Sequence, residues 1–398
     1  MPPAPPRRSA PPHLVVMLAA ASCVLVAACA GTTDADVSSS GDATTIASTA
    51  PAPSTTGVPQ TTIPPAGTGD GDPVTIAFGG DIHYEGSLAT TLAKAPDTML
   101  AGVGDALATA DLAVVNLETA VTSGGQRQEK AFAFSAPPEA FDSLRAGGAD
   151  VISMANDHGM DYGPSGLAQT MQAVAEKSAP VIGIGNNESE AYRPFTAEVK
   201  GQRISVIAAT QVLDASLVAA WTATPTQGGV SSAKRIDRLV QAVTEARGQS
   251  DTVVVFLHWG TDKTLCPNTA QIDLAEKLVA AGADIVAGGH SHRVQGGGYL
   301  GDSYVHYGLG NLQFKAGSAD ARESGVLVVT VTGRRVDAAE WRPARIGADY
   351  LPVLETGTGA EASVARWNGR RDCTGLSGTA ASAPSTTAPS TTATSPGA

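Results

Sequence analysis

Histidine and carboxylate side chains recur at the ends of predicted strands, and this placement is the strongest indication of chemistry in the sequence. The chain has seven histidines, of which His13 lies close to the N-terminus. Five of the other six follow a predicted strand, beside glycine or another residue of a ligand-binding type. In open α/β folds, ligands gather at the carboxyl ends of the strands. The segments concerned are 80–83 (GDIH), 116–118 (NLE), 156–158 (NDH), 258–260 (HWG) and 289–292 (GHSH).

Two pairs of these residues have the spacing of metal ligands on an extended segment. Asp81 and His83 are two residues apart, so both side chains leave the same face and can hold one ion. His290 and His292 repeat this spacing, and Glu118 supplies a carboxylate that can bridge two cations. This mixed set suits Mn²⁺, Fe or Zn²⁺ better than Ca²⁺ or Mg²⁺. The absence of cysteine from the set argues against a structural zinc site.

Each motif also has a purely structural explanation. An isolated Asp-x-His pair seldom binds metal, and a tryptophan beside His258 is more often a packing feature. Segment 156–158 fits a simple turn, because Asn and Asp favour left-handed conformations. Asp161 and Asp262 either orient His158 and His258 as hydrogen-bond acceptors or are solvated loop carboxylates. The recurrence of five motifs in one domain favours a metal site over these alternatives.

Short apolar segments that alternate with amphipathic ones predict an α/β domain built in layers. The predicted strands are 74–78, 112–115, 151–154, 181–184, 204–208, 253–257, 285–287, 305–307 and 325–332. Two helices are clear, at 232–247 and 269–281, and Gly282 stands where a helix-ending glycine is expected. We expect the folded domain to span residues 73–345. A C-terminal extension, residues 346–398, then ends in a low-complexity tail.

The N-terminus carries the features of an export signal. Two arginines precede an apolar run, residues 14–28, which has the length of a signal-peptide core and is too short for a comfortable membrane span. Small residues then precede Cys29, as in a bacterial lipobox. Residues 1–28 are therefore predicted to be a lipoprotein signal peptide, and Cys29 the lipidated residue that anchors the protein to the cell membrane outside the cytoplasm. Ordinary signal cleavage next to Cys29 is the alternative.

Composition limits the remaining structure and the possible partners. Residues 29–72, rich in Ser, Thr and Pro, are expected to form a disordered linker because they have few apolar side chains to bury. The formal net charge of −12 argues against nucleic acid as a partner, since its binding needs clustered Lys and Arg. An acidic protein can still bind an acidic polymer if metal ions supply positive charge locally. In an oxidising compartment, Cys266 and Cys373 either form a disulfide or remain free thiols.

The order of the motifs resembles that of the CapA family, proteins associated with synthesis of the bacterial poly-γ-glutamate capsule. These proteins are similar to the calcineurin-like metallophosphoesterases. The matching stretches run from residue 74 to about residue 315 and cover most of the folded part. They are 80–81 (GD), 116–118 (NLE), 155–158 (ANDH) with 161–163 (DYG), 258–260 (HWG), 282–286 (GADIV), 289–292 (GHSH) with Gln295, and 307–311 (YGLGN). Several such motifs in one order make the resemblance highly specific.

The resemblance implies a four-layer α-β-β-α sandwich with a pocket for two divalent metal ions (Mn, Fe or Zn) at the strand ends. The implied ligands form two sets that share one bridging carboxylate: Asp81, His83 and His292 for one ion, His258 and His290 for the other, and Glu118 for both. It gives His158 the role of the acid that protonates the leaving group. The residues expected to support the ligands from behind are Asn116, Asp161 and Asp262.

Two positions depart from the expected patterns. The family usually has Asn-Asn-His where this chain has Asn156, Asp157 and His158, so either Asn156 or Asp157 can be the ligand. Glu118 stands where phosphoesterases use an aspartate of a GDxxD motif, which is missing from this sequence. The ligands of the second metal therefore stay open at this point.

The resulting hypothesis is metal-assisted hydrolysis by an exported lipoprotein. Two neighbouring cations activate water and stabilise charge on the substrate, and His158 donates a proton to the departing group. The family association makes an anionic envelope polymer such as poly-γ-glutamate, or its synthesis machinery, the expected partner. The alternative is a non-catalytic accessory that binds the polymer through its metals without cleaving it. An intact His158 favours the enzyme.

Replacing Cys29 tests the predicted membrane anchor. In Cys29→Ala the lipid has no attachment site, so the protein should move from the membrane fraction to the soluble fraction or the medium. Cell fractionation with immunoblotting measures this, and Cys23→Ala, within the apolar run, is the matched control that should stay with the membranes. Unchanged membrane association of Cys29→Ala, or an unmodified N-terminus by mass spectrometry, would contradict the prediction.

Overall fold

The computed structural model describes residues 71–382, and this part of the chain is organised around two large β-sheets. The predicted signal peptide (1–28), Cys29, the predicted linker up to residue 70 and residues 383–398 of the low-complexity tail lie outside the described residues. Within residues 71–382, no helix is long and apolar enough to cross a membrane.

The first sheet has eight strands and contains the first half of the candidate site. Its order is β18 (Pro352–Leu354), β17 (Arg335–Ile346), β16 (Glu323–Thr332), β1 (Val74–Ile82), β2 (Leu112–Leu117), β5 (Val151–Ser153) and β6 (Val181–Ile182), with β15 (Asn311–Gln313) also paired to β1. β1, β2 and β5 run parallel, whereas β16 pairs antiparallel with β1, and β17 with β16. The carboxyl ends of β1, β2 and β5 therefore lie at one edge of the sheet.

The second sheet has six strands, four of which run parallel. Its order is β13 (Gly297–Leu300), β14 (Ser303–His306), β12 (Ile285–His290), β11 (Thr252–Trp259), β9 (Gln202–Thr210) and β8 (Phe195–Val199). β13 and β8 pair antiparallel at its two edges. Two small sheets pair β10 (Gly229–Val230) with β7 (Ile184–Gly185), and β3 (Ala120–Val121) with β4 (Ser135–Ala136).

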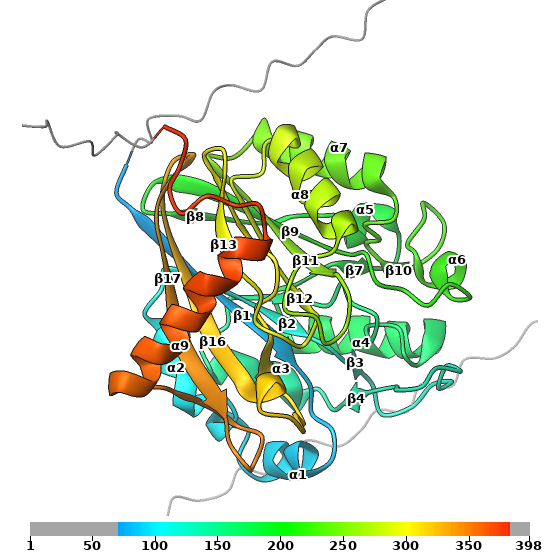
Figure 1. Ribbon diagram of the computed structural model, residues 1–398. Coiled ribbons are helices and arrows are strands. Elements are labelled where there is room, and N and C mark those ends of the chain that lie inside the picture. Colours follow the sequence, from blue (N-terminus) through cyan, green and yellow to red (C-terminus); the bar gives the residue numbers. More distant parts are fainter. Residues whose placement is uncertain (1–70, 383–398) are drawn as a thin grey trace, which may run out of the picture. The chain divides into compact units, whose positions relative to one another are not determined.

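Helices cover the outer face of each sheet (Figure 1). The helices that pack on the first sheet are α1 (Ser87–Lys94), α2 (Ala101–Ala108), α3 (Glu139–Ala146) and α4 (Gly163–Lys177). Those that pack on the second sheet are α7 (Ile236–Arg247) and α8 (Thr269–Ala281), which lie side by side. The short helices are α5 (Glu188–Ala191), α6 (Val218–Trp221) and the 3₁₀ turns η1 (Pro96–Thr98), η2 (Asp320–Arg322) and η3 (Arg370–Cys373).

Alternating side chains along the strands divide the apolar residues into three cores. In β1, Ala77 belongs to the core beneath α1 to α4, whereas Phe78 faces the second sheet. In β11, Phe256 faces the first sheet, and Val255 belongs to the core beneath α7 and α8. Phe78 and Phe256 stack across the gap with ring centroids 6.5 Å apart. Three cores separate four layers, so the α-β-β-α sandwich predicted from the sequence is confirmed.

The two helices predicted from the sequence differ in how closely their predicted bounds match the observed ones. α8 covers the predicted range, because Asn268 and Gln271 form a capping box at its start and Gly282, with φ 110°, ends it. α7 begins at Ile236 rather than at residue 232. Ser232 is still extended, since it forms a β-bridge with Thr210 and its backbone N–H and carbonyl bond to a tyrosine hydroxyl.

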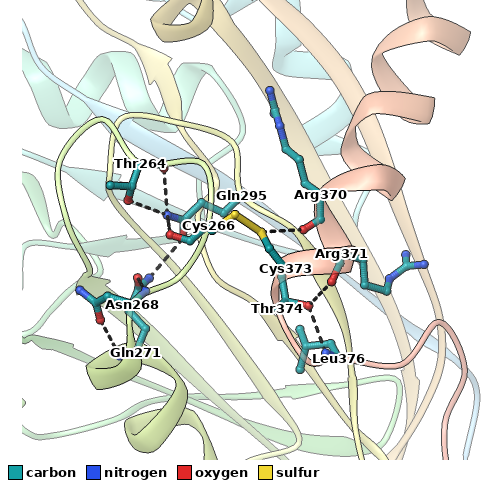
Figure 2. Close-up of a disulfide and its surroundings, with 10 residues drawn as sticks. All are labelled: Thr264, Cys266, Asn268, Gln271, Gln295, Arg370, Arg371, Cys373, Thr374 and Leu376. Carbon is teal, nitrogen blue, oxygen red and sulfur yellow. Dashed lines mark hydrogen bonds between the residues drawn. A yellow bond between two sulfur atoms is a disulfide. The ribbon is translucent and has the colours of Figure 1, made fainter.

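The chain after residue 345 remains packed on the two sheets. β17 runs on to Ile346, β18 pairs with it, and α9 (Gly357–Gly369) contacts β17. A disulfide then joins Cys373, at the end of η3, to Cys266, in the loop between β11 and α8 (Figure 2). Gln295 holds the same loop, because its amide donates to the carbonyls of Thr264 and Cys266 (Figure 2).

Removing the disulfide should destabilise the protein. Its cysteines are 107 residues apart, and a disulfide that closes so long a loop strongly restricts the unfolded chain. The double variant Cys266→Ser/Cys373→Ser should therefore have a free energy of unfolding about 2–4 kcal/mol lower. Chemical denaturation measures this, with reduced wild type as the control that should match the variant. Equal stability of oxidised and reduced wild type would show that the disulfide has no such effect.

Candidate metal centre

The carboxyl ends of parallel strands from both sheets meet around one group of acidic and imidazole side chains. Asp81 lies near the end of β1, Glu118 directly follows β2, and Asp157 lies in the segment after β5. From the second sheet, His258 comes from β11 and His290 from the end of β12. Ligands bind at such strand ends in α/β proteins, and here both sheets contribute side chains.

Segment 289–292 bends sharply around the carboxylate of Asp81. A Cβ at position 289 would collide with Asp81 Oδ1, so only glycine fits there. His290 (φ 88°) and His292 (φ 50°) have positive φ, which is uncommon for residues with a side chain. The His290 N–H donates to Asp81 Oδ2 at 3.0 Å. Such backbone strain clusters at functional sites, where surrounding contacts enforce it.

Three overlapping groups of side chains have ligand atoms within 4.8 Å of one another. They are Asp81, Glu118 and His258; Asp157, His258 and His290; and Glu118, Asp157 and His158. His258 Nε2 is 2.9 Å from Asp157 Oδ1 and 3.2 Å from His290 Nδ1. Because the groups share His258, Glu118 and Asp157, they offer adjacent positions for cations.

Glu118 gives the most direct indication that these residues fit a cation. Its side chain is fully buried, and its Oε1 has no hydrogen-bond partner within residues 71–382. The Nε2 atoms of His292 and His158 lie 3.6 and 3.8 Å from it. Burial and the nearby carboxylates of Asp81 and Asp157 raise the pKa of Glu118 well above its usual value. A divalent cation among the three carboxylates would offset this unfavourable accumulation of charge.

Asp81, Asp157 and His290 are in the forms that bind cations, whereas, despite the burial of His292, the carboxylate of Asp81 raises its pKa. Burial raises the pKa of Asp81, but the neighbouring His292 outweighs it, and the pKa is lowered overall. The pKa of Asp157 is lowered well below its usual value, because the effect of burial is outweighed by adjacent histidines, His158 foremost. Burial lowers the pKa of His290 to about 4, so its ring is neutral at pH 7 and available to a metal.

The structure distinguishes the two candidates in the segment after β5. Asn156 uses its whole side chain internally: Nδ2 donates to Asn116 Oδ1 at 3.0 Å and to a backbone carbonyl, and Oδ1 accepts from the His158 N–H at 3.0 Å. Asp157 instead directs a carboxylate oxygen towards His258. The geometry therefore favours Asp157 over Asn156 as a ligand.

Asn116 contacts two of the candidate ligands, whereas Asp262 lies in the lining of the adjacent cleft, without a contact to His258 among the described residues. Asn116 Nδ2 donates to Asp81 Oδ1 at 2.8 Å and lies 3.2 Å from His258 Nδ1. Asp262 is exposed and pairs with Lys263 at 3.2 Å. The hydrogen bonds and ion pairs found for His258 in the described part of the chain do not include Asp262.

His158 is held by contacts on two sides. Its Nδ1 is 2.6 Å from Asp161 Oδ2, and its ring stacks on Phe134 with centroids 4.1 Å apart. The opposite nitrogen, Nε2, lies 3.6 Å from Asp157 and 3.8 Å from Glu118. In the neutral ring, Asp161 favours a proton on Nδ1, which leaves Nε2 as the nitrogen that can gain or lose a proton at the centre.

His83 and His292, the remaining predicted ligands, differ in their contacts. His292 Nδ1 lies 3.2 Å from Asp81 Oδ2 and 2.9 Å from Asn311 Oδ1. His292 lies outside the three groups, and so does His83. The Nε2 of His83 accepts the Lys315 N–H at 2.8 Å, so in the neutral ring the proton is on the buried Nδ1, and this arrangement leaves neither nitrogen of His83 available to a metal.

A cleft of about 750 Å³ opens beside the centre. His83, His158 and His292 line it together with Phe134 and Phe314. The volume is that of a typical ligand-binding site. A substrate in this cleft would lie against the candidate acid His158.

A sequence profile described as "Bacterial capsule synthesis protein PGA_cap" matches residues 75–316, more than half of the chain. The chain belongs to this family. The matched range contains every candidate ligand of the metal centre, and it confirms the family resemblance seen in the order of the motifs. Cys373 and the rest of the C-terminal extension lie outside the matched range.

Individual members of the capsule synthesis family show the same relationship. The chain is 31% identical to the capsule biosynthesis protein CapA of Bacillus anthracis over 206 residues, 51% of this chain and 49% of the relative. It is 28% identical to the PGA biosynthesis protein CapA of Bacillus subtilis over 292 residues, 70% of this chain and 76% of the relative. A probable polyglutamine synthesis accessory protein of Mycobacterium tuberculosis is 26% identical over 189 residues, 46% of this chain and 50% of the relative. The chain thus spans about half the length of two of these relatives.

Two solved structures align with this chain at low similarity. A novel phosphatase from Mycoplasma pneumoniae aligns with a TM-score of 0.43 and 12% identity, over 74% of this chain and 98% of that chain. A 5'-nucleotidase from Candida albicans aligns with a TM-score of 0.41 and 12% identity, over 69% of this chain and 52% of that chain. At these scores the family assignment rests on the sequence match alone.

Lys130 is a candidate functional residue that the sequence analysis missed. Its side chain is only 6% exposed, and its ammonium lies 3.0 Å from Asp161 and 3.7 Å from Asp157, whose carbonyl also accepts a hydrogen bond from it. It thereby links a candidate ligand to the carboxylate that holds His158. Lys130 stands in a loop without a recognisable motif, and its importance follows only from its burial.

Substitutions at positions 156 and 157 should separate a structural role from metal binding. Asp157→Asn should lose bound metal, and with it the rise in melting temperature that metal gives to the folded state. Asn156→Ala should retain metal but lower the free energy of unfolding by about 1–3 kcal/mol, because it leaves buried polar groups unpaired. Elemental analysis after reconstitution with Mn²⁺ or Zn²⁺, together with thermal and chemical denaturation, measures both effects.

Loss of metal in Asn156→Ala, together with retained metal in Asp157→Asn, would instead make Asn156 the ligand. Wild type that binds no metal after reconstitution would remove the metal centre altogether.

Proposed function

We propose that this member of the capsule synthesis family is an exported, lipid-anchored, metal-dependent hydrolase. Its substrate is an anionic envelope polymer such as poly-γ-glutamate, which it acts on during synthesis, release or processing. The observation that carries the proposal is the position of His158, which is fixed by Asp161 with Nε2 facing the candidate ligands Glu118 and Asp157. A site that only bound polymer through metals would not need a proton donor held in this way.

Two divalent ions of the Mn, Fe or Zn type fit the donor set. Asp81 and Glu118, with His258, form one candidate group, and Asp157 with His290 and His258 forms the other. When bound, such ions supply positive charge to the reacting group and activate water for attack. The mixed carboxylate and imidazole donors suit these metals.

The protein's own residues would supply the proton transfer. Protonated His158 would donate its Nε2 proton to the departing oxygen or nitrogen of the substrate. Asp161 stabilises the imidazolium through Nδ1, and Phe134 restricts the ring by stacking. Lys130 keeps Asp161 in place and compensates its buried charge.

The names of the relatives support the polymer as substrate and also suggest the alternative. The Bacillus subtilis relative is a PGA biosynthesis protein, and the Mycobacterium tuberculosis relative is a probable synthesis accessory protein. In the accessory function, the metal centre would bind the polymer within a capsule synthesis complex without cleaving it.

If His158 is a proton donor, the loss of turnover caused by His158→Ala should depend on the leaving group of the substrate. His158→Ala should reduce turnover of substrates with poor leaving groups by about 10²–10⁴-fold, the usual contribution of general acid catalysis. Turnover of a nitrophenyl ester should fall much less, because nitrophenolate departs without a proton. Steady-state kinetics on both substrates measures this, with the metal content of each protein as the internal control.

Three results would contradict the proton-donor role of His158 or the hydrolase function. Equal loss on both substrates would remove His158 from the acid role. Loss of metal in His158→Ala would make this residue a ligand instead. Wild type without activity on either substrate or on poly-γ-glutamate, although loaded with metal, would favour the accessory function.

A further inference from the structure

The cleft beside the metal centre concentrates positive charge in an otherwise acidic protein. The chain has 26 Lys and Arg residues against 38 Asp and Glu residues. Within the cleft lining this balance is reversed: the basic residues are Arg127, Lys263, Arg293 and Lys315, and the acidic ones are Glu85 and Asp262. Negative substrates are attracted to such a local field even when the whole protein repels them.

The two acids in the lining compensate little of this charge. Glu85 accepts a hydrogen bond from the Ser135 N–H at 3.1 Å, so one of its oxygens is directed at the backbone. Asp262 pairs with Lys263 at 3.2 Å, but the two side chains are 44% and 73% exposed. An exposed pair of this kind is weak and exchanges readily for another anion.

Each basic residue lies on a segment bonded to the region of the metal centre. The N–H of Gln128, next to Arg127, donates to the carbonyl of Asp161 at 2.8 Å. The N–H of Lys263 donates to the carbonyl of Ser291, between two candidate ligands, at 2.8 Å.

Arg293 and Lys315, the other two basic residues of the cleft, also bond to residues of the candidate site. The Arg293 guanidinium donates to the carbonyl of His292 at 2.7 Å, and the N–H of Lys315 donates to His83 Nε2 at 2.8 Å. Four separate loops, each anchored close to the candidate site, thus carry the basic side chains around the cleft.

We propose that this cleft binds a chain of carboxylates, poly-γ-glutamate, through Arg127, Lys263, Arg293 and Lys315, and so presents one of its bonds to His158. This proposal rests on the proposed function for the identity of the polymer. Arg127, Lys263 and Lys315 are exposed, unlike the groups of a site that encloses a small anion and buries most of its surface. Exposed cations from four loops suit a flexible polymer with a charge on every repeat.

The test measures binding without turnover. All proteins carry His158→Ala, so that cleavage does not interfere, and all are loaded with Mn²⁺. Fluorescence anisotropy of labelled poly-γ-glutamate at low salt compares this parent with the triple variant Arg127→Gln/Lys263→Gln/Lys315→Gln. Each exposed ion pair contributes a small factor, so the loss of three should weaken binding by roughly tenfold. The difference should shrink in high salt, which screens exposed charges.

A matched triple variant controls for net charge. Lys94→Gln/Lys234→Gln/Lys277→Gln removes three exposed lysines that do not line the cleft, and it should bind the polymer like the parent. Equal affinity of the cleft variant and the parent, or equal weakening by the control, would overturn the proposal. Tighter binding of polyphosphate through the same three residues would overturn the assignment to polyglutamate. Wild type that binds but never hydrolyses the polymer would instead refute only the proposed hydrolase.

Discussion

The fold concentrates three carboxylates, two of them fully buried, at the junction of its two sheets, and much of the surrounding structure compensates for them. Asp81, Glu118 and Asp157 come from three parallel strand ends, and the first two are fully buried. Uncompensated charges in such a place cost far more than any single packing defect. Histidines and amides offset part of the charge, but Glu118 Oε1 remains without a hydrogen-bond partner among the described residues. The described residues therefore supply too little positive charge for these carboxylates, and divalent cations would supply the rest.

This constraint explains features that packing alone does not. The chain accepts two histidines with positive φ and a glycine without room for a side chain, so that segment 289–292 can surround Asp81. Asn116 and Asn156 also use their amide groups to hold one another, Asp81 and the neighbouring backbone. A buried polar network of this kind is stable only when nearly all its members are paired. The amides are thus as necessary to the centre as the ligands.

Much of the fold and part of the site could be predicted because their signals are local. The bounds of α8 follow from its cap and its terminal glycine. The extended backbone expected for the pair His290 and His292 was wrong, because β12 ends at His290 and both histidines have positive φ. α4 and α9 were missed because their apolar faces are weakly marked by alanine and glycine. The choice between Asn156 and Asp157 needed hydrogen bonds to residues far away in the sequence. Lys130 gave no signal, since its burial depends on contacts with Asp161 and Trp221.

Segment 122–134 contacts both the cleft and the residues around His158. Arg127 lines the cleft, Lys130 lies between Asp157 and Asp161, and Phe134 stacks on His158. The segment is itself anchored to the centre, because Asp161 accepts the Gln128 N–H through its carbonyl and the Phe134 N–H through its carboxylate. The lining of the cleft and the position of His158 thus depend on the same short stretch of backbone.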